Sequence, residues 1–205
     1  MIGSHNTFTY LTPSCKINNL TKRWWKTQCK TIKEQYDFGV RMFDIRVCLK
    51  RGKWTYCHGL VDFKEGKRDL MEICSYMKTY FPEAIYRIVL EKGNKFTQRR
   101  FINEARHLCE LYPNLWRVDI KAYKKWYGFI ANNNKNLYNR GYLFAYNEVW
   151  DTPCHEIHGF VTKKNFLKIN LAKEAKKLNK DTFSKADLLS KDTLYFIDYC
   201  TNEYK

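Results

Sequence analysis

Residues 41–49 have the sequence RMFDIRVCL, and this stretch decides the predicted fold. Apolar side chains occupy every second position, and the positions between them carry Asp44 and Arg46. Successive side chains of a β-strand point to opposite faces, so one face of this segment is apolar and the other is charged. We therefore expect a strand that packs on a core with one face and presents Asp44 and Arg46 on the other.

The segments around this strand alternate between helical and extended patterns. Apolar residues at helical spacing predict helices over 21–38, 69–81, 97–111 and 165–178. Runs rich in β-branched and aromatic residues predict strands over 54–60, 85–90, 142–149 and 193–198, while 119–130 fits either state. Helices that alternate with strands are typical of an α/β fold with a parallel sheet.

Composition bounds the class of protein. The 205 residues suit one domain spanning 1–205, because no repeat or linker interrupts them. Lys and Arg number 37 against 21 Asp and Glu, a formal charge of +16, yet 13 Phe, 15 Tyr and 6 Trp exclude a disordered polycation. No apolar run is long enough to span a membrane. A positive surface favours polyanions: nucleic acid, anionic lipid or a phosphate-bearing substrate.

The eight cysteines are scattered without a CxxC pair, which is typical of buried, reduced thiols in a cytosolic protein. The first residues show no secretory pattern. We therefore expect a cytoplasmic monomer, with peripheral membrane attachment or release from the cell left open.

Four polar side chains stand at or near expected strand ends. His5 follows a short apolar start, His58 precedes Gly59 at the end of a strand, and Asp44 and Arg46 share one strand face. Each has an ordinary structural explanation when taken alone. Together they suit phosphoryl transfer, because one imidazole can remove a proton and a second can supply one. A guanidinium binds phosphate oxygens, and a carboxylate orients an imidazole.

The order of the motifs resembles the X domain of phosphatidylinositol-specific phospholipase C, in its bacterial, metal-independent type. The matching segments are GSHNT (3–7), FGVRMFDIRV (38–47), YCHG (56–59), IVLEK (88–92) and FIDY (196–199). The resemblance is dense over 1–93, sparse over 94–190, and returns at the end. It implies a small, irregular TIM-like (β/α) barrel.

The resemblance also implies catalytic roles. His5 matches the general base that deprotonates the inositol 2-hydroxyl, and Asp198 matches the carboxylate that orients this base. His58 matches the general acid that protonates the departing diacylglycerol oxygen. Arg46 matches the phosphate-binding arginine, and Asp44 matches the acidic residue that holds the arginine and the acid. The implied products are a cyclic inositol phosphate and diacylglycerol.

Two positions depart from the metal-independent pattern. Asn6 stands where those enzymes have aspartate and the calcium-dependent branch has asparagine. Glu91 or Lys92 matches a position that is a calcium-binding glutamate in one branch and a substrate-binding lysine in the other. Because Arg46 stands in the metal's place, we expect that the protein uses no metal or other cofactor, and calcium is the less favoured alternative. We assign Asn6 and Lys92 to substrate binding.

The head-group pocket is expected to involve residues of the sparse region, and we assign Arg117, Asp119, Glu148 and Asp151 to it. Cys154–His158 contains two histidines that could ligate zinc, but no second ligand pair stands at structural-site spacing, and a loop is the alternative. A lysine-rich stretch over 163–180 is either a solvated face or a surface that docks on anionic lipid.

These observations lead to one functional hypothesis and two alternatives. The hypothesis is a phosphodiester-cleaving lyase that acts on an inositol phospholipid, in peripheral contact with an anionic membrane, or on a soluble phosphodiester. The first alternative is a non-catalytic basic module on the same scaffold that binds nucleic acid or phosphorylated ligands, although two imidazoles are not needed for that. The second is a related barrel acting on a glycerophosphodiester or sphingolipid. Those barrels use a metal held by acidic residues, so Arg46 disfavours it.

Overall fold

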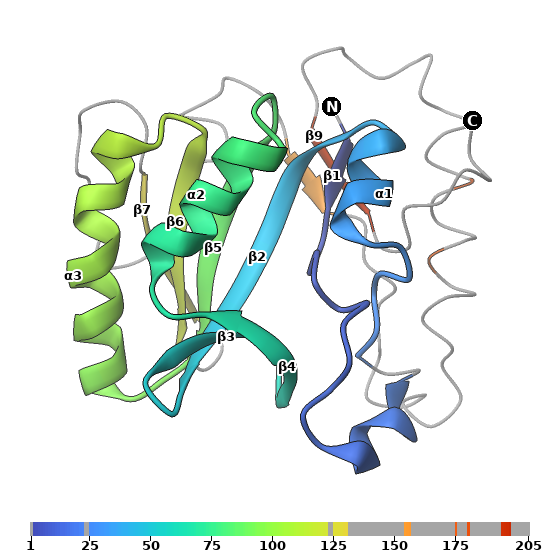
Figure 1. The fold of residues 1–205 in the computed structure, drawn as a ribbon, viewed down its shortest axis with the longest axis horizontal. Coiled ribbons are helices and arrows are strands. Elements are labelled where there is room, and N and C mark those ends of the chain that lie inside the picture. The colour runs from blue at the N-terminus through green and yellow to red at the C-terminus, as the bar shows by residue number, and fades with distance from the viewer. Residues whose placement is uncertain are drawn as a thin grey trace.

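The computed structural model describes residues 2–22, 25–122, 125–130, 154–156, 175, 180 and 194–197, and it has a mixed α/β fold (Figure 1). The strand expected over 142–149 lies outside the described residues, as does nearly all of the basic helix expected over 165–178.

The strands of the described residues form one sheet. They are β1 (Ile2–Ser4), β2 (Val40–Lys50), β3 (Lys53–His58), β4 (Val61–Lys67), β5 (Ile85–Lys92), β6 (Leu115–Ala122), β7 (Lys125–Ile130), β8 (Cys154–Glu156) and β9 (Leu194–Ile197). The order is β7-β6-β5-β2-β1-β9-β8, with β3 paired to β2 and β4 to β3. Neighbours from β6 through β8 are parallel, whereas β3, β4 and β7 are added as antiparallel strands.

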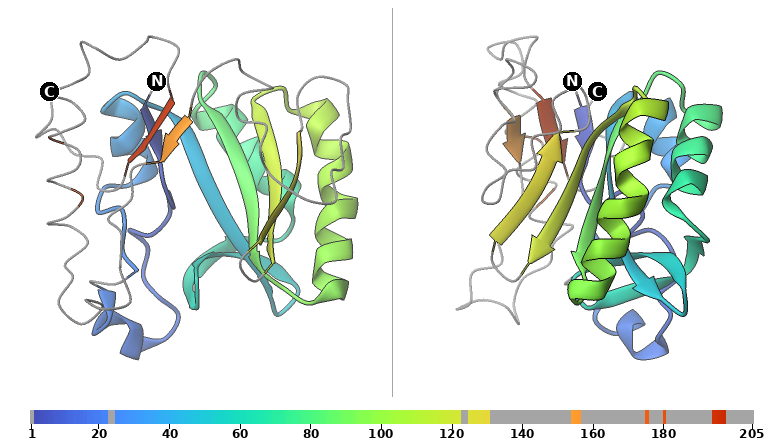
Figure 2. Two further views of the ribbon diagram at one scale, coloured as in Figure 1. Left: turned by 180° about the vertical axis from the view of Figure 1, so that it is seen from behind. Right: turned by 90° about the vertical axis from the view of Figure 1, so that its left-hand side faces the viewer.

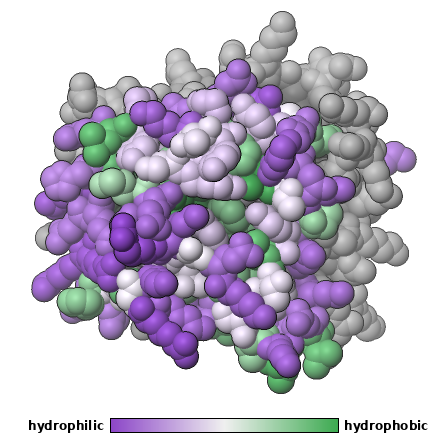
Figure 3. All heavy atoms as spheres, in the orientation of Figure 1, coloured by the Kyte–Doolittle hydropathy of each residue, from purple (hydrophilic) through white to green (hydrophobic). Residues whose placement is uncertain are grey.

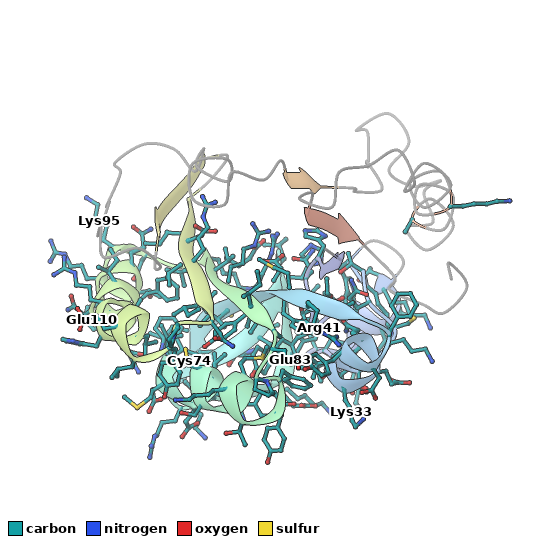
Figure 4. All side chains as sticks on the ribbon, turned by 90° about the horizontal axis from the view of Figure 1, so that it is seen from above. Lys33, Arg41, Cys74, Glu83, Lys95 and Glu110 are labelled. Atoms are coloured by element: carbon teal, nitrogen blue, oxygen red, sulfur yellow. The ribbon has the colours of Figure 1, made fainter. Side chains whose placement is uncertain are left out.

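Three α-helices cover one face of this sheet: α1 (Ile32–Asp37), α2 (Leu70–Tyr80) and α3 (Lys95–Leu111) (Figure 2). Both edges of the sheet, β7 and β8, bend toward the side away from the helices (Figure 4). Among the described strands no pairing joins β7 to β8, so this sheet is open and a closed barrel is not part of the described structure.

The two faces of the sheet differ as the sequence of β2 predicts. Phe43, Ile45 and Val47 join Ile88, Leu90, Val118 and residues of α2 and α3 in the hydrophobic core. The opposite face carries buried polar side chains: Asp44, Arg46, Arg87, Glu91, Arg117 and Asp119. The helices therefore cover the apolar face of the sheet, and the opposite, concave face carries the polar side chains.

Most expected elements are confirmed with small shifts of their ends. Helices 69–81 and 97–111 correspond to α2 and α3, and the ambiguous segment 119–130 belongs to the two strands β6 and β7. The helix expected over 21–38 is wrong in its first half, because α1 begins only at Ile32. Thr31 is its N-cap and forms a capping box with Glu34, and a capping box fixes where a helix starts.

Candidate active site

Four neighbouring strands bring the candidate residues together. His5 directly follows β1, Asp44 and Arg46 lie on β2, His58 ends β3, and Glu91 lies near the end of β5. Strands β1, β2 and β5 are parallel, so their carboxyl ends lie at the same edge of the sheet. In Figure 1, β1 and β2 both run from the top of the molecule downward.

Arg46 is the centre of this cluster and is 5% exposed. Its Nε donates to Oδ2 of Asp44 at 3.0 Å, and its Nη1 donates to Oε2 of Glu91 at 3.0 Å. Its Nη2 lies 3.0 Å from Nε2 of His5. One guanidinium therefore joins two carboxylates and one imidazole, and its planar array of N–H donors suits three partners that lie in different directions.

Asp44 holds the cluster to the backbone and to β5. Its Oδ2 accepts from the backbone amide of Asn6 at 3.0 Å, and its Oδ1 accepts from Nε of Arg87 at 2.7 Å. Complete burial by itself would raise the pKa of Asp44, but Arg46, Arg87 and His5 together hold that pKa well below its usual range. Asp44 is therefore a fixed anion across the physiological pH range.

The hydrogen bonds of His58 define a neutral imidazole. Its Nδ1 lies 2.5 Å from the carbonyl oxygen of Trp25, which can only accept, so Nδ1 carries the proton. Its Nε2 then accepts from the Asn6 amide nitrogen at 3.2 Å. Burial lowers the pKa of His58 to about 4, assisted by the positive charge of Arg46 and by His5 and opposed by Glu91 and the Trp25 carbonyl.

His5 is fixed through both its ring and its backbone. Because a guanidinium can only donate, Nε2 of His5 presents a lone pair to Arg46, and this is the state that a general base needs. The His5 carbonyl accepts from Nε2 of Gln28 at 3.0 Å. Asn6, at a left-handed φ of 48°, turns its amide nitrogen to within 3.0 Å of His5 Nε2. The two imidazole rings are 6.4 Å apart between centroids.

Glu91, rather than Lys92, faces the cluster. Nζ of Lys92 donates instead to the Leu60 carbonyl at 3.2 Å and to Asp62 at 3.1 Å. The signal that identifies Glu91 is the parallel register, in which Asp44 lies beside Arg87 and Arg46 beside Val89. Alternation then puts residue 91 on the same face, together with Arg87, which the sequence reasoning also did not assign.

Arg117 and Asp119 lie one strand further, on the same polar face. Arg117 is aligned with Arg87 and Asp119 with Val89. Nε of Arg117 donates to Oδ1 of Asp119 at 2.7 Å, and both side chains are buried. Burial raises the pKa of Asp119 against the opposing charges of Arg117 and Arg87. Its Oδ2 is buried without a hydrogen-bond partner among the described residues.

Other assigned residues fall outside the described part of the chain, namely Glu148, Asp151 and Asp198. The segment that contains the two candidate zinc-binding histidines is described only as strand β8, Cys154–Glu156. Within the described residues no group of three or more His, Cys, Asp or Glu could hold a metal ion. Asp44 and Glu91 both bond Arg46, so the oxygen atoms best placed for a calcium ion already face a cation. This arrangement does not fit calcium.

None of the helices in the described ranges has the length and apolarity needed to cross a lipid bilayer.

Sequence comparison supports the predicted resemblance over part of the chain. No family model matches the chain. It is 31% identical over 106 residues to human PI-PLC X domain-containing protein 2, a match covering 41% of this chain and 34% of that protein. The mouse protein of the same name is 30% identical over 129 residues, covering 52% of this chain and 36% of the relative. The chain thus spans about a third of the length of these curated relatives.

Solved structures share the fold. Phosphatidylinositol-specific phospholipase C from Listeria monocytogenes superposes with a TM-score of 0.66 at 15% identity, covering 100% of this chain and 89% of that one. The enzyme from Staphylococcus aureus, in a structure concerned with its membrane binding, gives 0.59 at 14% identity and covers 97% and 85%. The predicted resemblance to phosphatidylinositol-specific phospholipase C is therefore confirmed for the fold.

Proposed function

We propose that this chain cleaves a phosphodiester as a phosphatidylinositol-specific phospholipase C does, by attack of a neighbouring substrate hydroxyl on phosphorus. The observation that carries the proposal is Arg46, whose guanidinium lies against His5 and is fixed by Asp44 and Glu91. A cation at this point neutralises the charge that builds up on the equatorial phosphate oxygens.

His5 is the proposed general base. Its Nε2 lone pair takes the proton of the attacking hydroxyl, which is the inositol 2-hydroxyl if the substrate is phosphatidylinositol. Strand register supports a role for Asp198 beside it, because β9 is parallel to β1 with Ile197 opposite Ser4. The next residues in the sequence after these two strands are Asp198 and His5. A carboxylate there would hold the protonated imidazole.

His58 is the proposed general acid, and its low pKa is a property of the protein without substrate. A bound phosphodiester anion raises the pKa of a nearby imidazole, because an opposite charge favours the imidazolium. The protonated Nε2 then gives its proton to the departing alcohol, and His5 gains one, so protons balance. The Asn6 amide can serve both protonation states of His58. Its nitrogen faces Nε2 of neutral His58, and its Oδ1, a buried acceptor without a partner among the described residues, could accept from protonated Nε2.

The polar face supports two of the remaining assignments. Arg117 and Asp119 are proposed to meet the head group, since the available carboxylate oxygen of Asp119 suits a sugar hydroxyl. Glu148 and Asp151 stay assigned to the same pocket. We also propose that the rest of the chain completes a small TIM-like barrel, since both sheet edges bend to the same side. The site would then lie at the carboxyl ends of its strands, where such barrels carry their chemistry.

The proposed partner is an inositol phospholipid in an anionic membrane, or a soluble phosphodiester of the same head group. No metal enters the proposed mechanism. Apolar side chains near the carboxyl ends of the strands support the membrane contact: Ile17 is 65% exposed, Leu20 is 81% exposed and Leu60 is 92% exposed. Leu60 lies between β3 and β4, two residues after His58, and the backbone of Ser14 bonds that of Asp62. Figure 3 shows hydrophobic atoms at the lower edge, over Lys16–Asn19.

The direct test is product formation from phosphatidylinositol vesicles in EDTA, followed by phosphorus NMR. We expect a cyclic inositol phosphate in EDTA and no requirement for added calcium. A folded sample that yields no product with or without calcium contradicts the proposal. Saturable phosphate binding in that same sample would favour the non-catalytic module.

Substitution of the two imidazoles tests their roles. His5→Ala and His58→Ala should each lower kcat by about 10²- to 10⁴-fold, the usual contribution of a general acid or base. His107→Ala is the matched control, because His107 is exposed on α3. A loss below about threefold for either site variant would remove that residue from the mechanism.

A further inference from the structure

Glu91 connects two strands that carry different parts of the site. Its Oε2 accepts from Nη1 of Arg46 on β2 at 3.0 Å, and its Oε1 accepts from the backbone amide of Gly59 at 3.1 Å. Gly59 follows His58 directly and has a left-handed φ of 56°. The Glu91 side chain is 1% exposed. One buried carboxylate therefore spans from the phosphate-binding guanidinium to the turn that carries the second imidazole.

We propose that Glu91 is the positioning residue that fixes Arg46 and the His58–Gly59 turn relative to each other, a role that rests on the proposed phosphodiester cleavage. The two oxygen atoms divide the task. Oε2 keeps Nη1 of Arg46 occupied, so the guanidinium plane is set and Nη2 stays directed at His5. Oε1 holds the turn after β3, and the carbonyl of Trp25 holds the other side of the His58 ring.

The same carboxylate acts on the charge of His58. Arg46 on β2 and His5 after β1 oppose protonation of His58, whereas Glu91 on β5 and the Trp25 carbonyl favour it. Removing the negative charge of Glu91 leaves the positive charge of Arg46 less balanced, so the pKa of His58 should fall further. A residue that only filled space would not alter the titration of this imidazole, so that titration separates positioning from packing.

An opposite role for Glu91 is an internal anion that blocks Arg46 until substrate displaces it. The bond from Gly59 disfavours this role, because a displaceable plug has to leave Arg46 while Oε1 is tied to the backbone. The two roles predict opposite kinetics. Loss of a positioning carboxylate slows the reaction, whereas loss of a plug speeds it and tightens anion binding.

The experiment compares Glu91→Gln with Glu91→Asp. Glutamine keeps the side-chain length and an acceptor for the Gly59 amide, but it loses the negative charge that faces Arg46. Aspartate keeps the charge but is one methylene too short to reach both partners. Glu83→Gln is the control, because Glu83 is an exposed carboxylate just before β5, at the opposite end of that strand. Three measurements are made: kcat and KM on phosphatidylinositol vesicles, the NMR titration of His58, and binding of inorganic phosphate.

For Glu91→Gln we expect kcat to fall by about 10- to 100-fold, as for loss of an outer partner that orients a reacting group, with a smaller change in KM. The His58 titration should move to lower pH, and Glu91→Asp should restore that titration toward wild type while recovering only part of kcat. Glu83→Gln should leave all three unchanged. Faster turnover in Glu91→Gln, or an unaltered His58 titration, overturns the inference.

The outcome stays distinct from that of the proposed function. If the wild-type protein has no activity, the proposed function fails, yet the His58 titration and phosphate binding still measure the link to Glu91. If Glu91→Gln does not fold, the same measurements on Glu91→Asp decide the question. An unchanged kcat in that variant would show that the bridge between Arg46 and Gly59 is not required.

Discussion

At the scale of single residues, Arg46 is the side chain on which the site depends for both charge balance and geometry. It neutralises two buried carboxylates, and its three nitrogens contact Asp44 on its own strand, Glu91 on β5 and His5 after β1. A buried ion pair is a weak source of stability compared with apolar packing, but removing one partner leaves an uncompensated charge. The cluster is therefore expected to be sensitive to single substitutions.

Arg46→Met tests this dependence. We expect the free energy of unfolding to fall by about 3–5 kcal/mol, because Glu91 and Asp44 lose a buried counter-ion. Arg68→Met is the control, since the Arg68 side chain is 77% exposed and its ion pairs lie on the surface. Urea denaturation at pH 7 measures both variants. A loss in Arg46→Met no larger than that of the control would show that the carboxylates do not need the guanidinium.

The titration of His58 predicts a pH dependence of stability. The pKa of His58 is about 4 in the folded protein, against 6.5 for an unperturbed histidine. The unfolded chain therefore takes up this proton first, and stability decreases as the pH falls from about 6.5 toward 4. His58→Gln should show a smaller decrease between pH 7 and 5 than the wild type, and His107→Gln should not. Equal decreases in wild type and His58→Gln would contradict a half-buried imidazole that is neutral in the folded protein.

At the scale of elements, the segment before α1 holds the loop that carries His5. Oγ1 of Thr9 accepts from the backbone amide of Thr27 at 3.1 Å and from that of Gln28 at 2.8 Å. Gln28 in turn donates to the His5 carbonyl. The helix expected over 21–38 is shortened for this reason, because Thr27 and Gln28 bond the loop after β1 instead of continuing a helix.

Thr9→Val should weaken this attachment. The substitution keeps the shape but leaves two backbone amides without an acceptor, which costs about 1–3 kcal/mol for each buried group left unsatisfied. Thr12→Val at an exposed position of the same loop is the control. Thermal unfolding measures stability, and the NMR signal of the His5 ring reports the loop. Equal stability of the two variants would show that the Thr9 bonds are not structural.

At the scale of the whole molecule, the excess of positive charge and the exposed Leu20 and Leu60 predict which edge of the sheet would contact the membrane in the proposed function. The formal charge is +16. Leu20 and Leu60 lie near the carboxyl ends of the strands, whereas Leu111 ends α3 and precedes β6, at the opposite end. The face carrying α2 and α3 is largely hydrophilic in Figure 3, with single exposed apolar side chains scattered over it: Met71, Tyr80, Phe96 and Leu111.

Vesicle binding tests this orientation. Binding to anionic vesicles should weaken as salt is raised from 0.1 to about 0.5 M, because exposed charges are screened. Leu20→Ser combined with Leu60→Ser should weaken binding by about 10-fold or more, since burying one leucine contributes about 1.5–3 kcal/mol. Leu111→Ser should bind as the wild type does. Binding that is insensitive to the double substitution would exclude this edge as the membrane contact.

The sequence by itself determined the elements whose side-chain period is unambiguous. The alternation in residues 41–49 places Asp44 and Arg46 on one face and Phe43 and Ile45 on the core side, because strand geometry leaves no other arrangement. The two imidazoles were identified by the order of the motifs GSHNT (3–7) and YCHG (56–59), since each histidine taken alone has an ordinary structural explanation.

Only the tertiary structure decided how these pieces meet. The parallel register of β2 and β5 selects Glu91 over Lys92, and a shift of one residue would have exchanged them. The helical spacing of apolar residues over 21–38 does not produce a helix at residues 27 and 28. Their buried backbone amides are instead bonded to the side chain of Thr9, and buried amides need such an acceptor. The low pKa of His58 likewise arises from burial and from Arg46, groups that are distant in the chain and adjacent only in the folded protein.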